Sequence, residues 1–362
     1  MAEEPEVSLV VNGSIHEGWK QVTVRSSIEE LAHSFNVEYS QRWSNSGEPV
    51  AINPGDAVQL RIGDTLAITG YVDDSNEDYD ASTHTVSVTG RSKTADLVDC
   101  AAVHKGGSIR GKDLRQVADL LCAPFGITVS LSEPGLDIGD ASNVQIQDGE
   151  SVFETLNAIA RKEGVLLLTN AAGNLVLSRA SSEPKASLEL RTAENIKRGT
   201  LRSSHRDRFS TYLLKGQAPG SGTLKGVAAA SMKYQTTDDT VTRYRPTVIV
   251  DSNTTLARMQ QRAAWERNTR AGRALALTYD VQGWTNIYGL WQPNTLLRVV
   301  DTFLGIDAEL LVTSVDLNRS LDSGRTARLE LQPRETFDVL KPPKPPKRQK
   351  KNKGANAAAL GL

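Results

Sequence analysis

The chain contains little cysteine, few aromatic residues and no long apolar run. Cys100 and Cys122 are the only cysteines among its 362 residues, which is too few for a disulfide framework, and they form no CxxC motif. No apolar stretch approaches the roughly 20 residues that a transmembrane helix needs. The acidic start Met1–Glu6 lacks the apolar segment of a secretory signal. We therefore expect a soluble protein with reduced thiols, found in a cytoplasm, and without a membrane span.

The sequence also lacks the common motifs of metal, nucleotide and nucleophile sites. Its five histidines show no HxH, HExxH or Cys-His spacing, which argues against zinc. The segment Gly220–Lys225 lacks both the third glycine of a dinucleotide loop and the ending of a phosphate loop, and no GxSxG elbow occurs. We expect no catalytic, cofactor-binding or metal-binding residues. Two carboxylates that only the fold brings together leave little trace in one sequence, so a hydrolase of that kind stays an alternative.

One segment is strongly acidic. Asp73–Asp80 (DDSNEDYD) places five acids in eight residues. A calcium loop would need a glycine where Tyr79 stands and a glutamate where Thr85 stands. We interpret the segment as a solvated acidic hairpin tip.

Charge is divided unevenly along the chain. The net charge is −1, but Lys341–Lys353 holds seven of the 42 basic residues and no acid, so 35 basic residues face 43 acidic ones elsewhere. Alternating lysine and proline favour an extended, solvated segment. A flexible terminus is one interpretation, and a tether to an acidic partner or to nucleic acid is the other.

The main feature that is present is a pattern that occurs twice, about 240 residues apart. Pro54 opens the first run, which continues through Leu66–Asp73 to the alternating segment His84–Val88. Pro293 opens the second, which continues through Leu310–Asp316 to Ala327–Leu331. Alternation of apolar and polar residues over short β-branched runs predicts half-buried antiparallel strands. Two copies indicate a duplicated β-domain, with chance similarity between two β-meanders as the alternative.

The segment between these copies has a different pattern of apolar residues. Apolar residues at helical spacing occupy 114–122 and 152–160, and each helix is followed by a glycine stop, at Gly126 and Gly164, and then by a short apolar strand. This pattern predicts an α/β insert built from a repeated helix-strand unit. Within the first copy, helical periodicity is weak apart from a short stretch near Ser26–Ala32.

The second copy contains two further segments. The glycine-rich run Gly216–Gly226 predicts a mobile loop. Helical spacing recurs at 255–274, where five arginines accompany the single acid Glu266. A solvated, partly paired helix face is one interpretation of these arginines, and a contact surface for an acidic neighbour or DNA is the other.

We therefore predict an α+β fold that is mostly β, with two related tube-like β-barrel domains, a small α/β insert domain and one long helix. The expected division is 1–104 for the first tube-like domain, 105–180 for the insert, 181–340 for the second tube-like domain with its helix at 255–274, and 341–362 for a disordered basic tail.

Several segments resemble one family in the right order. Val7–Gly13 with Gly18-Trp19, Gly70–Asp73 and Val88–Lys93 look like the opening domain of baseplate hub proteins from Mu-like phages. Glu150–Leu156 is similar to the central segment of that family. Its closing domain is matched by Gly283-Trp284, Gly289–Asn294 and Glu309–Val312. The candidate family-motif or interface residues are Trp19, Gly90, Arg91, Trp284, Trp291 and Pro293. Both closing tryptophans are expected in the core, with subunit anchoring as the alternative.

The resemblance implies a structural function without chemistry. Hub proteins of this type form a homotrimer in which two tube-like domains per subunit alternate around a ring, and such a ring joins a sixfold tail tube to a threefold spike. The implied partners are a tail tube or distal tail protein, the central spike, a tape-measure protein and baseplate wedge or peripheral proteins, with transient passage of DNA. The implied location is the virion tail tip, after assembly in the host cytoplasm.

Two other functions remain open at this point. One is a tail-associated hub that degrades peptidoglycan, and the other is a carbohydrate-binding β-protein of a host-recognition apparatus. The second would present exposed aromatic residues in loops, whereas the five tryptophans fall mostly within predicted strands.

Overall fold

The computed structural model describes residues 6–40, 52–80, 84–138, 141, 143–217, 232–252, 256–320 and 324–337. The basic segment 341–362 and most of the glycine-rich run 216–226 lie outside these ranges, and so do the expectations for them. None of the helices in the described ranges is both long enough and apolar enough to cross a bilayer.

The first β region consists of antiparallel strands whose alternate residues are buried. In the last of them, Val86 and Val88 are buried while Thr85 and Ser87 are partly exposed, which is the period of two that the sequence predicts. Its strands are β1 (Val7–Val11), β2 (Ser14–His16), β3 (Gln21–Ser27), β4 (Ser34–Ser40), β5 (Ala57–Ile62), β6 (Thr65–Tyr79) and β7 (His84–Ser92).

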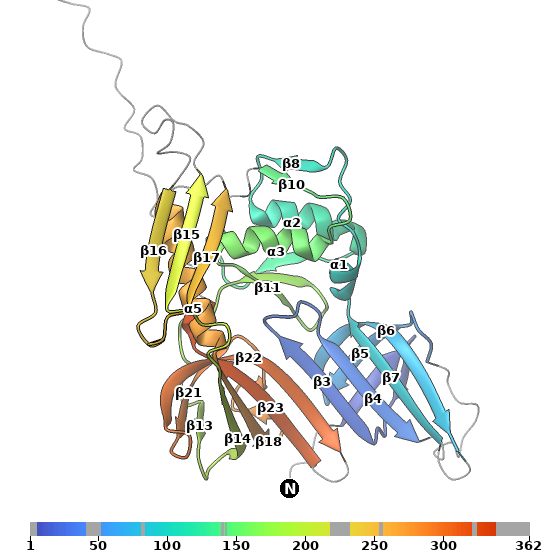
Figure 1. The fold of residues 1–362 in the computed structure, drawn as a ribbon. Helices are drawn as coiled ribbons and strands as arrows, with labels where there is room; N and C mark the ends of the chain where they lie inside the picture. Colours follow the sequence, from blue (N-terminus) through green and yellow to red (C-terminus); the bar gives the residue numbers. More distant parts are fainter. Residues whose placement is uncertain are drawn as a thin grey trace, which may run out of the picture.

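The insert forms its own layered unit with its own core (Figure 1). Capping boxes at Asp113 and Ser151 start its two longer helices, and Gly126 and Gly164 follow them in the left-handed region. The repeated helix-strand unit is thereby confirmed. Its elements are α1 (Ala95–Asp99), β8 (Ser108–Arg110), α2 (Leu114–Cys122), the 3-10 helix η2 (Ala123–Phe125), β9 (Val129–Leu131), β10 (Asn143–Gln145), α3 (Val152–Glu163), β11 (Leu166–Thr169) and β12 (Leu175–Ser178).

The second β region repeats the first and adds a layer to it. Its strands are β13 (Glu189–Arg191), β14 (Ile196–Ser203), β18 (Leu275–Gln282), β21 (Thr295–Asp301), β22 (Ile306–Ser320) and β23 (Gly324–Gln332), followed by the 3-10 helix η3 (Arg334–Thr336). Between β14 and β18 lie β15 (Thr211–Gln217), β16 (Met232–Thr237), β17 (Pro246–Ser252) and α5 (Leu256–Arg273). A small hairpin, β19 (Thr285–Asn286) and β20 (Gly289–Leu290), precedes β21.

The two β regions share one topology. The first has the spatial order β1-β5-β6-β7-β4-β3, and the second has β13-β21-β22-β23-β18-β14. The long strands β6 and β22 each have 15 residues, and β7 and β23 each have nine. Both long strands shift register at the same place, after Val72 and after Val312. One difference is that β1 is antiparallel to β5 whereas β13 is parallel to β21.

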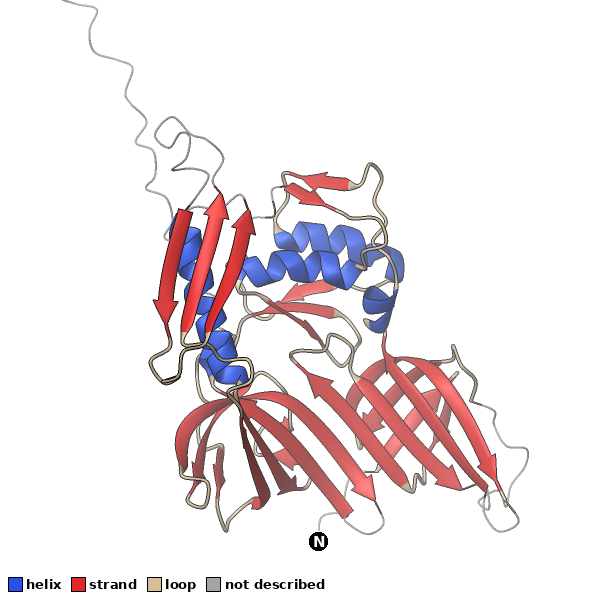
Figure 2. Ribbon diagram, in the orientation of Figure 1, coloured by secondary structure: helices blue, strands red, loops and turns tan. Residues whose placement is uncertain are grey.

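The two copies are joined edge to edge. Strand β3 of the first copy pairs antiparallel with β22 of the second, with Val22–Ser27 opposite Ser314–Arg319. A 13-stranded sheet results, and one hydrophobic core draws residues from both copies (Figures 1 and 2). The prediction of a mostly β fold with two related β units is therefore confirmed, and the structure adds the strand pairing that unites them.

One local expectation was wrong and another was incomplete. The stretch near Ser26–Ala32 is not helical, because Ile28 and Leu31 enter two different hydrophobic cores as the chain turns from β3 to β4. The acidic segment is not only a hairpin tip, because Asp73–Tyr79 continues strand β6 in pairing with β7. An acidic strand is tolerated here because its side chains at 74, 76 and 78 are exposed.

A buried chain of hydroxyl groups connects the first copy to the insert. The hydroxyl of Ser92 accepts from the backbone N–H of His33 at 3.0 Å and lies 2.8 Å from that of Thr94. The Thr94 hydroxyl lies 2.7 Å from that of Thr169 in β11, which donates to the carbonyl of Leu31 at 2.6 Å. This network fixes the loop before β4 against the insert.

Gly90 is required by the packing of the first copy. A Cβ at this position would meet the carbonyl oxygen of Tyr71 and would lie 2.5 Å from the ring of Phe35. We expect Gly90→Ala to lower the free energy of unfolding by about 2 kcal/mol, as overpacked cores do, in chemical denaturation. Gly13→Asn is the matched control, since that site is open and has φ of +85°, which asparagine tolerates. Equal stabilities of the two variants would contradict this account.

Candidate functional site: the polar face of the continuous sheet

One face of the continuous sheet is polar over eight strands, from β14 to β6. Along the inner strands β18, β23, β22, β3, β4 and β7, its residues alternate with residues that are buried in the shared core. The face therefore crosses both copies without interruption at the β3–β22 junction. Its polar positions include Thr200, Arg202, Thr278, Asp280, Thr326, Arg328, Asp316, Asn318, Thr23, Arg25, Asn36, Glu38, Thr85, Ser87, Asp74, Asn76 and Asp78.

A row of alternating charges crosses this face. The register places Arg198 opposite Asp280, Asp280 opposite Arg328, Arg328 opposite Asp316, and Asp316 opposite Arg25. Four strands of the second copy and one strand of the first thus contribute to a single row. Opposite charges at directly opposed positions stabilise neighbouring strands.

Contacts within the row neutralise two of its arginines, Arg328 and Arg25. Arg328 donates to Asp280 at 2.8 Å, and this hydrogen bond is the main reason that the pKa of Arg328 is raised. Arg25 donates to both oxygens of Asp316, at 2.9 and 3.2 Å, and also lies 3.2 Å from Glu30. The Arg25–Asp316 pair joins the two copies directly. The paired guanidiniums are already engaged with carboxylates, which reduces their capacity to bind a passing polyanion.

Arg91, a predicted family-motif residue, ties the first copy to the start of the insert. Its guanidinium lies 2.7 Å from Asp73 in β6 and 2.7 Å from Asp99 at the end of α1. Hydrogen bonds to these two carboxylates raise the pKa of Arg91. The hydrogen bond to Asp99 also lowers the pKa of the Asp99 carboxyl group. Arg91 thus fixes the orientation of the insert relative to the first copy.

The predicted tryptophans are all buried within this chain. Trp19 packs edge-on against Tyr39, with ring centroids 5.6 Å apart. The indole N–H of Trp284 donates to the carbonyl of Asn318 at 3.0 Å, and Arg325 lies 5.2 Å from its ring. Trp291 donates its backbone N–H to the carbonyl of Trp284 at 3.0 Å. These rings pack in the shared core, and a role in subunit contacts stays a prediction.

Pro293 lies where the second copy meets the end of the insert. It precedes Asn294, whose φ is +58°. The Asn294 side chain donates to the carbonyl of Arg179 at 2.9 Å and accepts from the backbone N–H of Ser181 at 2.9 Å. The structure therefore does not bring the six predicted residues together into one site.

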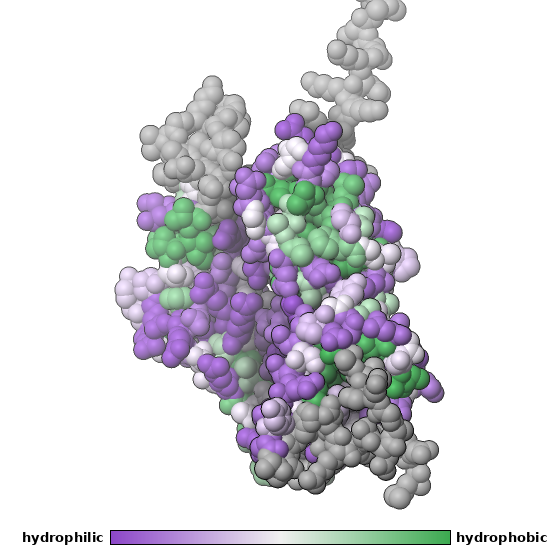
Figure 3. Space-filling view, turned by 90° about the vertical axis from the view of Figure 1, so that its right-hand side faces the viewer, coloured by the Kyte–Doolittle hydropathy of each residue, from purple (hydrophilic) through white to green (hydrophobic). Residues whose placement is uncertain are grey.

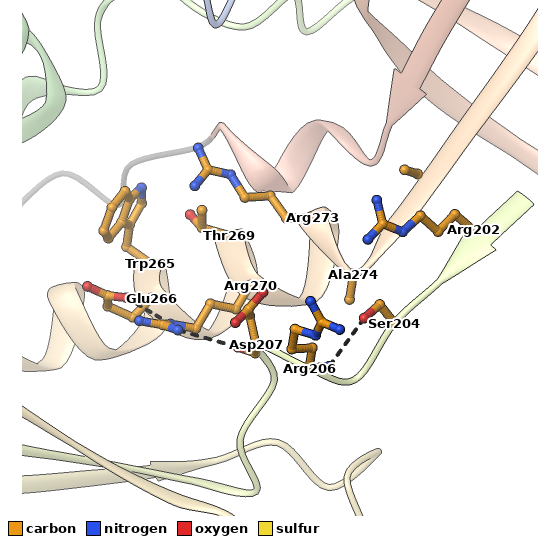
Figure 4. A pocket seen from close by; sticks show the side chains of 11 residues that line it. Arg202, Ser204, Arg206, Asp207, Trp265, Glu266, Thr269, Arg270, Arg273 and Ala274 are labelled. Atoms are coloured by element: carbon orange, nitrogen blue, oxygen red, sulfur yellow. Dashed lines mark hydrogen bonds and ion pairs between the residues drawn. The ribbon is translucent and has the colours of Figure 1, made fainter.

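A cavity of about 440 Å³ opens beside the end of β14 (Figure 4). Arg202 and Arg206 line it from β14 and the following loop, and Arg270 and Arg273 line it from α5. Its remaining lining residues are Ser204, Asp207, Trp265, Glu266, Thr269, Ala274 and Ala276.

Only some of these arginines are paired. Arg270 lies 3.1 Å from Glu266, and Arg273 lies 3.2 Å from Glu29 of the first copy. Within the described part of the chain, Arg202 and Arg206 have no ion-pair partner. The expectation of a partly paired arginine helix is therefore met, and the unpaired cations belong to β14 and its following loop.

The charge row and the cavity were not predicted from the sequence. Asp280, Arg328, Asp316 and Arg25 carry no motif, and their only signal is that each occupies an outward position of an alternating strand. Among the described residues, no group of three or more histidine, cysteine, aspartate or glutamate side chains could hold a metal ion.

The architecture is that of phage tail proteins. The 43 kDa tail protein of prophage MuSo2 from Shewanella oneidensis matches with a TM-score of 0.82 and 36% identity, covering 92% of this chain and 100% of that chain. A tail protein from Neisseria meningitidis matches with a TM-score of 0.80 and 23% identity, covering 93% and 99% of the two chains.

Sequence comparisons specify the family. Residues 6–92 match the N-terminal domain of the Mu phage baseplate assembly protein GpP-like family, residues 94–179 match the second domain of baseplate hub proteins like gp44, and residues 254–340 match the fourth domain of GpP. The baseplate hub protein gp44 of Escherichia phage Mu is 37% identical over 341 residues, which cover 92% of this chain and 89% of that protein. The chain belongs to the baseplate hub proteins of Mu-like phages.

Proposed function

We propose that three copies of this chain form a closed ring with pseudo-sixfold symmetry, which joins a sixfold tail tube to a threefold spike. The observation that carries the proposal is the β3–β22 junction, at which two equivalent β units already join edge to edge within one chain. Repeating that contact between chains would generate an alternating ring of six units from three subunits. Closed cyclic symmetry is the usual arrangement of soluble oligomers.

The differences between the two copies support a role in matching symmetries. Six strands of each copy correspond one to one, and only β2 of the first copy has no counterpart in the sheet, so the ring interior would be nearly sixfold. The elements β15 to β17 and α5 occur only in the second copy, and the insert follows only the first. Surfaces outside the sheet would therefore repeat three times. A ring of this kind offers sixfold contacts to a tail tube or distal tail protein and threefold contacts to a spike.

We further propose that the polar face lines a passage for DNA. The ion pairs of Arg25 with Asp316 and of Arg328 with Asp280 balance the charge at the centre of this face, and a large excess of cations there would hold DNA by phosphate contacts. The cross-strand pairs also fix the side chains of the face in place. The function in this proposal is mechanical, with no bond made or broken.

The remaining expectations belong to the same proposal. The chain would contact the tape-measure protein and wedge or peripheral proteins, and it would assemble in the host cytoplasm before it enters the virion. The division into 1–104, 105–180, 181–340 and 341–362 describes its units. In the view of Figure 3, hydrophobic side chains gather in a few patches, the broadest in the upper right of the picture, with hydrophilic side chains between them.

The proposal is tested by the oligomeric state of the purified chain. Mass photometry over a range of concentrations, with and without the spike protein, should show trimers that accumulate at high concentration or with the spike. Persistent monomers in the presence of the spike would contradict the ring. A peptidoglycan-clearing band in zymography, lost when one buried acid is replaced, would contradict the non-enzymatic function.

A further inference from the structure

We infer that the acidic half of strand β6 of one subunit pairs with strand β14 of a second copy of this chain and closes the arginine-lined cavity beside it. This inference rests on the proposed ring and specifies how its subunits meet. It follows from the strand register of the two copies, from the edges of β6 and β14 that are equivalent to the β3–β22 contact, and from the charges on those edges.

Strand β14 is the equivalent of β3. Leu201 pairs with Leu277 of β18 in the second copy as Val24 pairs with Phe35 of β4 in the first. Strands β18 and β4 are in turn equivalent by their pairing with β23 and β7. The resulting equivalents are Thr200 with Thr23, Leu201 with Val24, Arg202 with Arg25, Ser204 with Ser27 and Asp207 with Glu30.

The second half of β6 is the equivalent of the second half of β22. After the register shift in each strand, Asn76 lies opposite Ser87 of β7, and Asp316 lies opposite Arg328 of β23. The resulting equivalents are Asp74 with Ser314, Asn76 with Asp316 and Asp78 with Asn318.

The contact within the chain uses β3 but not its equivalent β14, and the second half of β22 but not that of its equivalent β6. Strand β22 has β23 on one side and β3 on the other over residues 314–319. Among the strands of the described ranges, the second half of β6 is paired with β7 and β14 is paired with β18, and Ile196 at the start of β14 also forms an isolated bridge with Thr192. The edge of β6 that faces away from β7 and the edge of β14 that faces away from β18 are therefore the counterparts of the β3–β22 contact.

The charges of the two edges are complementary. Strand β14 carries Lys197, Arg198 and Arg202, and no acid. The second half of β6 carries exposed Asp74 and Asp78 on the face of its polar positions. An edge rich in cations resists pairing with unrelated strands and favours an acidic one.

The β3–β22 contact within the chain also predicts the register of the contact between β14 and β6 of neighbouring chains. Arg25 lies opposite Asp316, and Thr23 donates to Asn318 at 3.2 Å. By equivalence, Arg202 lies opposite Asn76 of the neighbouring copy, with Asp74 and Asp78 on either side along the same face. Thr200 lies opposite Asp78 and can donate its hydroxyl proton to that carboxylate.

The cavity completes the comparison. In the first copy, Arg25 is held between Glu30 and Asp316. In the second copy, the equivalent Arg202 shares the cavity with Asp207, the counterpart of Glu30 (Figure 4), and a carboxylate from another strand is missing on its other side. The neighbour's Asp74, opposite Ser204, supplies that negative charge.

The register is tested by a pair of introduced cysteines. In a Cys100→Ser background, Thr200→Cys with Asp78→Cys should form covalent trimers on oxidation, seen on non-reducing gels. Thr23→Cys with Asn318→Cys is the in-chain positive control and should give a disulfide within one chain. Thr200→Cys with Ser75→Cys, which the register keeps apart, should give no covalent trimer. Trimers in mass photometry with cross-linking only of the Thr200–Ser75 pair would overturn the register while leaving the ring intact. Monomers alone would count against the ring itself.

A charge exchange tests the same contact without cysteines. Arg202→Glu should raise the concentration at which trimers form by about tenfold or more, because it places like charges at the contact. Asn76→Arg in the same chain should restore most of the loss. Unchanged assembly of Arg202→Glu, with the fold intact by circular dichroism, would overturn the inference.

Discussion

A ring of added lysines is expected to turn the proposed passage into a DNA-binding surface. Thr85 in β7 and Thr326 in β23 are equivalent positions on the polar face, opposite Asp78 and Asn318. Thr85→Lys combined with Thr326→Lys would add six cations to a trimer. Each cation can engage a phosphate, and non-specific affinity rises steeply with the number of such contacts. We expect plaque titre per assembled particle to fall by roughly tenfold or more, because ejected DNA is retained.

The matched control keeps side-chain length and removes the charge. Thr85→Gln combined with Thr326→Gln should leave titre close to that of the parent. Fluorescence anisotropy with duplex DNA should show binding by the lysine trimer that weakens as salt rises, and little binding by the glutamine trimer. Equal titres for the two variants would show that this face does not line the DNA path.

Acid should destabilise the contact between the first copy and the insert through His33. Burial lowers the pKa of His33 from 6.5 to about 4. As the pH falls, the unfolded state binds this proton before the folded state does. The contribution of neutral His33 to the free energy of unfolding is therefore present in full above pH 6.5 and is lost as the pH falls toward 4. The shift corresponds to about 3 kcal/mol of unfolding free energy. Denaturation midpoints measured between pH 7 and pH 4 should show this decline.

Replacement of the histidine separates this effect from general acid denaturation. His33→Gln should flatten the decline between pH 6.5 and 4, whereas His205→Gln, at an exposed site, should keep the pH dependence of the parent. A decline of the same size in all three proteins would show that His33 does not control it.

Local patterns predicted most of the fold because they reflect local physics. The alternation of Val86 and Val88 with Thr85 and Ser87 can only be satisfied by a strand with one buried face. The capping residue Ser151 and the stop at Gly164 mark the ends of α3 in the sequence itself. A second run of the first pattern then predicts a second unit of the same kind.

The candidate site could not be predicted in the same way because it depends on which strand edges meet. Nothing local in β3 or β22 specifies that they pair, since the contact joins residues such as Arg25 and Asp316 that lie 291 positions apart. The acidic segment of β6 was interpreted as a hairpin tip for the same reason. Its five acids indicate solvent exposure, and only the register with β7 shows that four of them continue a strand.

Imaging of the assembled hub tests the central claim most directly. A reconstruction viewed down the axis of the purified oligomer should show three chains that present six superimposable β units, with strand β14 of each chain beside β6 of the next. Six chains in the ring, an open chain of subunits, or units around β6 and β22 that do not superimpose would contradict it.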